Sequence, residues 1–119
     1  MAEIGLRNAI SVGDTRVIHL LFWAGLRDTI GDHTIIYALR HAGGNKIQVV
    51  NHILMHASMR PANKTKITPY AVPQEIGDIK DEAQKEKDQE KLDFMDAVTE
   101  STWYEVVKPR MDGFSGRLA

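Results

Sequence analysis

An internal repeat constrains the fold of this 119-residue chain more than any other feature. Residues 13–21 (GDTRVIHLL) recur thirty-two positions later as residues 45–53 (NKIQVVNHI). The stretch before each copy also matches at two apolar positions, Leu6 with Ile35 and Ala9 with Ala38. A period near thirty residues is typical of helical solenoids, in which each pair of antiparallel helices buries its apolar face against its neighbours.

Apolar residues between positions 6 and 58 fall at helical spacing and are interrupted by glycine-containing turns. Asp14 and Asn45 are expected N-caps, because their side chains can accept hydrogen bonds from the first free N–H groups of a helix. Gly13, Gly25 and Gly43 stand where a helix would end on a left-handed residue. The pattern predicts four short helices, over residues 4–12, 15–24, 33–41 and 46–56.

The composition changes after residue 58. Residues 59–78 contain three prolines, which remove backbone donors and favour extended conformations, so they predict a linker or extended arm. Residues 79–102 lack glycine and proline and are rich in charged helix formers, so they predict one long charged helix. Residues 103–119 begin with aromatic and β-branched residues and predict a C-terminal tail. With residues 1–58 as a helical array, the expected fold class is all-α.

The helical half resembles the ankyrin repeat. Residues 9–25 are similar to the family's second-helix pattern, with a small residue, a glycine turn, paired β-branched residues, paired leucines and a closing glycine. In residues 31–38 (GDHTIIYA), His33 and Thr34 stand where the family has Thr-Pro. The resemblance covers residues 4–58 and implies about two units that bind other proteins. A generic pair of helical hairpins would show the same spacing.

Three departures from the family pattern accompany this resemblance. The segment between Gly25 and Gly31 is shorter than the family's hairpin finger, and Gly43 and Gly44 form an insertion in the turn. Thr68 could begin a third unit, but the prolines and charged residues that follow do not match its second helix. The resemblance therefore implies a short, degenerate array.

Charge and composition exclude several functional classes. Lys and Arg number 15 against 16 Asp and Glu, so the net charge of −1 gives no general attraction to nucleic acid or to an anionic membrane. The absence of cysteine excludes disulfides, thiolate metal sites and thiol catalysis. Residues 17–26, the longest apolar stretch, are too few to span a bilayer, and residues 1–10 lack a secretory signal. We expect an intracellular protein, cytoplasmic or organellar, with the mitochondrial matrix side included.

Two groups of residues could carry chemistry. His52 and His56 are four residues apart on one helical face, the spacing at which two imidazoles can bind zinc, but neither a base nor a third ligand accompanies them. Asp28, Asp32 and His33 lie in one turn, where capping and turn roles explain the carboxylates without catalysis. We therefore expect neither catalytic residues nor a cofactor. A small metal- or ligand-binding enzyme using His52 and His56 is the alternative.

The aromatic segment after residue 102 has two open interpretations. Trp103 and Tyr104 could anchor a partner protein, since large aromatic residues dominate binding hot spots. They could equally fold back and cap the open end of the helical array.

The sequence predicts a non-catalytic protein–protein interaction module, a small accessory or adaptor subunit of a larger assembly. A self-assembling structural protein is a further alternative, in which the long helix pairs with its own copy, although charged residues interrupt any apolar seam. The candidate contact residues lie in the inter-repeat turn, at the end of the next helix and in the tail: Arg27, Asp28, His33, Arg40, His41, Trp103, Tyr104 and Arg110.

Overall fold

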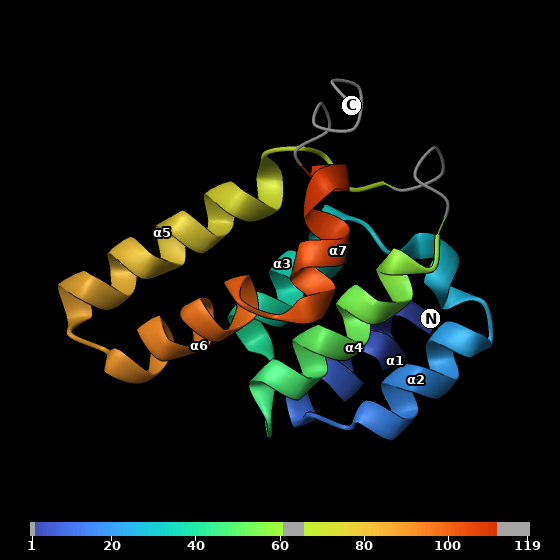
Figure 1. The fold of residues 1–119 in the computed structure, drawn as a ribbon. Coiled ribbons are helices and arrows are strands. Elements are labelled where there is room, and N and C mark those ends of the chain that lie inside the picture. Colours follow the sequence, from blue (N-terminus) through green and yellow to red (C-terminus); the bar gives the residue numbers. More distant parts are fainter. Residues whose placement is uncertain (1, 61–65, 112–119) are drawn as a thin grey trace.

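The computed structural model describes residues 2–60 and 66–111 and is shown in Figure 1. These residues form seven α-helices and one 3-10 helix and contain no β-strand, so the all-α prediction is confirmed. The elements are α1 (Ala2–Val12), α2 (Thr15–Trp23), η1 (Leu26–Thr29), α3 (Asp32–His41), α4 (Lys46–Ser58), α5 (Ala71–Glu86), α6 (Gln89–Thr99) and α7 (Thr102–Met111). In the described ranges, no helix is both long and apolar enough to cross a membrane.

The four helices predicted in the N-terminal half are all present; half of their ends coincide with the prediction and the others differ by one or two residues. Both predicted N-caps are confirmed: an Oδ1 oxygen of Asp14 accepts from the Val17 N–H at 3.1 Å, and Oδ1 of Asn45 accepts from the Gln48 N–H at 3.3 Å. The two caps are 31 positions apart, so the structural repeat is one residue shorter than the spacing read from the sequence.

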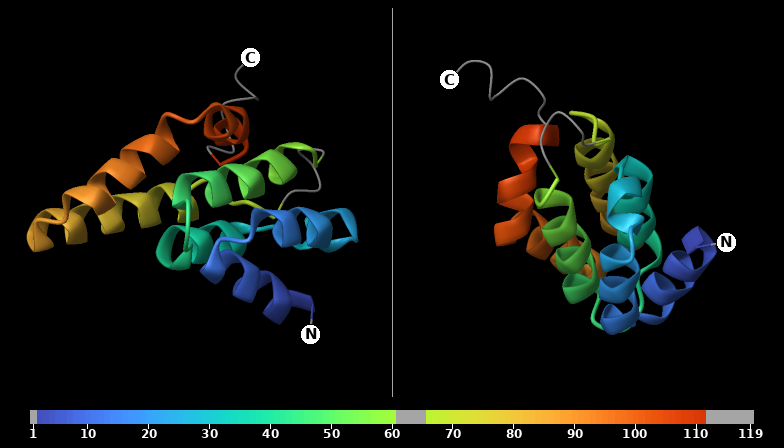
Figure 2. Two further views of the ribbon diagram at one scale, coloured as in Figure 1. Left: turned by 90° about the horizontal axis from the view of Figure 1, so that it is seen from below. Right: turned by 90° about the vertical axis from the view of Figure 1, so that its right-hand side faces the viewer.

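The helices form two neighbouring rows (Figure 2). Helices α1, α3 and α5 pack side by side in one row, and α2, α4 and α7 in the other, with α6 against α4 and α5. Helix α1 and helix α7 lie at opposite edges of the molecule. Helix α4 is central, and its buried face supplies six residues to the interior: Val49, Val50, Ile53, Leu54, His56 and Ala57.

The turn between α1 and α2 touches the turn between α3 and α4. The Gly43 N–H donates to the Ile10 carbonyl at 3.0 Å, and a Cβ atom on Gly43 would lie 2.1 Å from the Ser11 carbonyl oxygen. Only a residue without a side chain allows two backbones this close. The left-handed conformation expected at Gly43 occurs instead at Gly44, where φ is +59°. The glycine insertion therefore lets the turn between α3 and α4 lie against the end of α1 and the turn that follows it.

The prediction of an extended arm is wrong for residues 71–78, because α5 begins at Ala71. Pro73 lies in the first turn of this helix, where the N–H groups have no intrahelical acceptor and a missing donor costs little. Pro61 and residues 112–119 of the expected tail lie outside the described residues.

The prediction of one long helix is also wrong. Lys87 adopts a left-handed conformation with φ of +56°, and Asp88 then caps α6 by accepting from the Lys91 N–H at 3.1 Å. Helices α5 and α6 pack against each other as a third helical pair, which buries Ile79 and Met95 within the chain. The apolar face that could have paired with a second copy is therefore used internally. Residues 102–111, expected in the tail, form α7.

Candidate functional site

The structure gives Arg27 and Asp28, in the inter-repeat turn, different neighbours. The Arg27 guanidinium lies over the Trp23 ring, with Cζ 4.1 Å from the ring centroid, and its Nε donates to Nδ1 of His56 at 3.2 Å. Asp28 forms an ion pair with Arg60. Both charged side chains thus connect the short η1 helix to α2, to α4 and to the residues just after α4.

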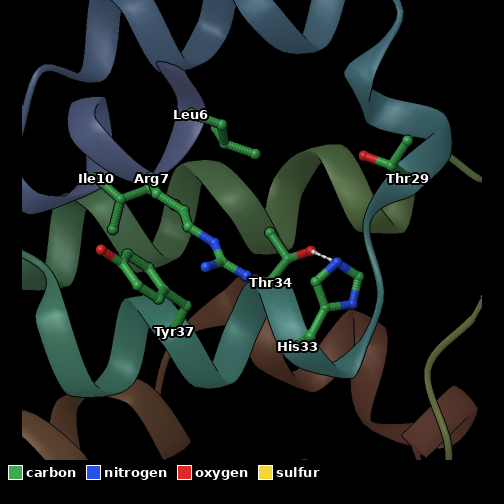
Figure 3. A pocket seen from close by; sticks show the side chains of 7 residues that line it. All are labelled: Leu6, Arg7, Ile10, Thr29, His33, Thr34 and Tyr37. Atoms are coloured by element: carbon green, nitrogen blue, oxygen red, sulfur yellow. Dashed lines mark hydrogen bonds between the residues drawn. The ribbon is translucent and has the colours of Figure 1, made fainter. Parts of the chain in front are cut away.

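His33 lines a hollow between α1 and α3, shown in Figure 3. The Arg7 side chain reaches from α1 toward α3 and places its Cζ 5.3 Å from the centroid of the Tyr37 ring. The free volume of the hollow is about 20 Å³, which is room for about one water molecule. The Ser11 and Tyr37 hydroxyls lie 3.0 Å apart beside it. The hollow is therefore a packed joint between two helices, too small for a ligand as it stands.

A network of histidines joins α2 to α4. Nε2 of His56 lies 2.9 Å from Nδ1 of His19, and Nδ1 of His52 lies 2.8 Å from the Gln48 carbonyl oxygen. Because the Arg27 Nε can only donate, His56 Nδ1 accepts from it, and the proton of a neutral His56 sits on Nε2 and is donated to His19. The carbonyl of Gln48 likewise requires the proton of His52 on Nδ1.

His56 is fully buried, and this burial controls its chemistry. Burial lowers the pKa of His56 to about 4, and electrostatic repulsion from His19, Arg27 and His52 acts in the same direction. The ring is therefore neutral at physiological pH, and both of its nitrogens are used in hydrogen bonds. An imidazole in this position holds α2, η1 and α4 together.

Metal binding through His52 and His56 finds little support in this geometry. The two rings do belong to one helix face, but His56 is already bonded to Arg27 and His19. Within the described ranges, no group of three or more His, Asp or Glu side chains is placed to hold a metal ion.

The carboxylate of Asp32 accepts from the N–H and hydroxyl groups of Thr68, the latter at 2.6 Å, and so anchors the chain that leads into α5.

Arg40 and His41 are placed at the end of α3. Arg40 forms ion pairs with Glu75 and Glu82 of α5, and hydrogen bonds to Glu82 and then Glu75 raise the pKa of Arg40. The ring of His41 lies 4.6 Å from that of Tyr37. Arg40 thus attaches the third helical pair to the second.

The three candidate residues of α7 separate into two groups. Tyr104 is only 6% exposed and belongs to the core. Arg110 donates to the carbonyls of Ala57 and Ser58 at 2.8 and 3.1 Å, which joins α7 to the C-terminal end of α4. Trp103 is only partly buried and packs at the edge of the core. Tyr104 and Arg110 therefore fit the capping interpretation, and Trp103 is left partly open.

Trp103 borders a surface groove that α4 forms with α6 and α7, three helices that lie together in Figure 1. Two adjoining hollows of about 380 and 320 Å³ make up this groove and share Asn45 and Ile47. We call it the α4 groove. Its apolar lining is Ile47, Met55, Phe94, Ala97 and Trp103, and its polar lining is Asn45, Lys46, Gln48, Asn51, His52, Glu90 and Asp93, together with Gly44.

One polar atom of the α4 groove lacks a partner. Oδ1 of Asn51 is buried and accepts no hydrogen bond from any described residue. A buried acceptor without a donor costs about 1 to 3 kcal/mol, so this oxygen favours a water molecule or a ligand N–H beside it. On the rim, Nζ of Lys46 lies 6.0 Å from the centroid of the Phe94 ring.

Trp103 was predicted from the sequence as a contact residue, whereas the other apolar residues of the lining were not. A weak signal was present, because Phe94 and Ala97 each precede a buried residue of α6, Met95 and Val98. Two apolar residues beside an apolar stripe make the stripe wider than one neighbouring helix can cover.

We compared the chain with family models, with curated proteins and with solved structures, and none of the three comparisons gives a significant match. Its function therefore has to be inferred from its own geometry.

Proposed function

We propose that this chain is a non-catalytic protein-interaction module, an accessory or adaptor subunit of a larger assembly, and that it holds a segment of a partner protein in the α4 groove. The observation that carries this proposal is the apolar lining of the groove, with Trp103 partly open beside it. Each hollow is within the size range of protein ligand sites, about 300 to 1,000 Å³.

Trp103 is suited to be the main anchor. Partly buried aromatic residues in a hollow supply large contact area at little conformational cost, and tryptophan is enriched among binding hot spots. The rim residues, which are polar, would surround this contact as in ordinary protein interfaces.

Two further features of the expected function belong to this proposal. An intracellular location agrees with a chain that has no cysteine, and an overall charge of −1 agrees with protein partners better than with nucleic acid or an anionic membrane. We also interpret α1 to α4 as two degenerate ankyrin-like units, a resemblance supported by the repeated Asn or Asp caps and by the two-row packing.

We expect Trp103→Ala to weaken partner binding by about 1 to 4 kcal/mol. A loss of about 1.4 kcal/mol already lowers the affinity tenfold. The tagged full chain would be purified from its native source, cross-linked and analysed by mass spectrometry, and its affinity for the recovered partner would then be measured. Val106→Ala is the matched control, because Val106 is exposed on α7 and does not line the groove. Equal affinities for the wild type, Trp103→Ala and Val106→Ala would exclude the α4 groove as the binding site.

The neighbouring residue should behave differently. We expect Tyr104→Ala to lower the free energy of unfolding by about 3 kcal/mol, since it removes a buried aromatic side chain from the core. Urea unfolding measures this change. Partner affinity of the folded protein should stay within about twofold of the wild type. A variant of normal stability that has lost its partner would instead make Tyr104 a contact residue.

A further inference from the structure

We infer, on the basis of the proposed function, that the segment received by the α4 groove is a basic amphipathic helix of the partner protein. This inference depends on how charge is distributed along the chain and on the spacing of the apolar residues that line the groove.

Acidic residues outnumber basic residues in the segment that contains α6. Residues 88–105 contain six Asp and Glu and one Lys, a formal charge of −5, so the remainder of the chain carries +4. Glu90 and Asp93 line the groove itself and are exposed, and neither forms an ion pair with another described residue. Lys91, the one basic residue of this segment, is bound to Glu86 at 2.9 Å.

Lys46 is the basic residue of the lining and lies close to Phe94. It leaves the lining with one more acidic than basic side chain, and the remaining acidic residue of α6, Asp96, is paired with Lys80 of α5 at 3.4 Å. The field at the groove is therefore weakly negative and comes from Glu90 and Asp93. A partner with Lys or Arg would be attracted to this field. Nucleic acid and anionic lipid would be repelled, so a protein segment is the better match.

The apolar lining has two ends. Phe94 and Ala97 line one hollow, Met55 and Trp103 line the other, and Ile47 lies where the two hollows meet. Ile47 and Met55 are eight residues apart on α4, which corresponds to about 12 Å along the helix axis. A bound helix spans about 10.5 to 12 Å between positions i and i+7 or i+8, so one apolar residue of such a pair would contact Ile47 and the other would contact Met55.

The occupant should be a helix and not an added strand. A strand would need an open sheet edge to pair with its backbone, and the described residues contain no β-strand. A helix satisfies its own backbone groups, and its side chains alone must match the groove.

Selection from a random peptide library tests this inference. Phage displaying peptides of about 16 residues, long enough for four helical turns, would be selected on the immobilised full-length chain. We expect the selected sequences to have a net positive charge and apolar residues seven or eight positions apart. In a Trp23→Phe background, Trp103 is the remaining tryptophan, and its fluorescence reports binding of a synthetic peptide from the selection.

Charge reversal provides the matched comparison. Glu90→Lys combined with Asp93→Lys should weaken binding of the selected peptide at least tenfold. Asp78→Lys combined with Asp81→Lys makes the same change in net charge at two exposed residues of α5, and it should change binding by less than about threefold. A tenfold loss in the α5 variant as well would show that only overall charge matters and would overturn the inference.

The remaining outcomes separate the inference from the proposed function. Neutral or acidic peptides whose binding is lost in Trp103→Ala would overturn the basic helix and leave the groove as a protein-binding site. Peptides that bind Trp103→Ala as well as the wild type, or a selection that yields no binder, would overturn both.

Discussion

Gly43→Ala is expected to lower the free energy of unfolding by about 3 kcal/mol, because the new Cβ atom would overlap the Ser11 backbone. It would lie 2.1 Å from the Ser11 carbonyl oxygen and 3.1 Å from its carbonyl carbon. These are backbone atoms of the last turn of α1, so no side-chain rotation can relieve the overlap. The two turns would have to separate, which would also stretch the hydrogen bond from the Gly43 N–H to the Ile10 carbonyl. Urea unfolding of the two proteins measures the change.

Gly77→Ala is the matched control for this prediction. Gly77 lies inside α5, and a Cβ atom there would meet nothing within 4 Å. Alanine restricts the unfolded chain and favours helix, so this variant should be more stable than the wild type by about 0.5 to 1 kcal/mol. A Gly43→Ala protein as stable as the wild type would mean that the two turns are not in contact.

The N-terminal half was predictable because its signals are local. A cap side chain acts within three residues and glycine acts at its own position, so Asp14, Asn45 and the glycine turns show where α2 and α4 begin. The C-terminal half was harder, since its signals depend on context. Pro73 marks either an arm or the first turn of a helix, and Lys87 takes a left-handed conformation that the sequence suggests only through the following cap residue, Asp88.

The α4 groove and the histidine network could not be predicted from one sequence, because both join residues far apart in the chain. The spacing of His52 and His56 correctly placed them on one helix face. It gave no sign that the bonding partners of His56 would be His19, 37 positions away, and Arg27. Trp103 was identifiable by its type, but its site depends on α4, which ends more than forty residues earlier.

The stability of the fold should depend on pH through His56. In the unfolded chain this residue titrates near the ordinary histidine pKa of 6.5, whereas burial and the neighbouring His19, Arg27 and His52 lower its pKa to about 4 in the fold. Between these two values the unfolded chain binds a proton that the folded chain does not. Stability is therefore full above about pH 6.5 and falls as the pH drops toward 4, by about 2 to 3 kcal/mol from this residue.

His56→Gln isolates this effect from the titration of carboxylates. Its amide oxygen can accept from Arg27 and its NH₂ group can donate to His19, but it binds no proton in this range. Urea unfolding at pH 7.5, 6.5, 5.5 and 4.5 should therefore show a weaker loss of stability for His56→Gln than for the wild type, by about 2 to 3 kcal/mol over the series. His41→Gln, at an exposed position, should follow the wild type. Parallel curves for His56→Gln and the wild type would mean that folding does not lower the pKa of His56. A His56 that is protonated in the folded protein could not accept from Arg27, so the hydrogen-bond directions described for the network would be wrong.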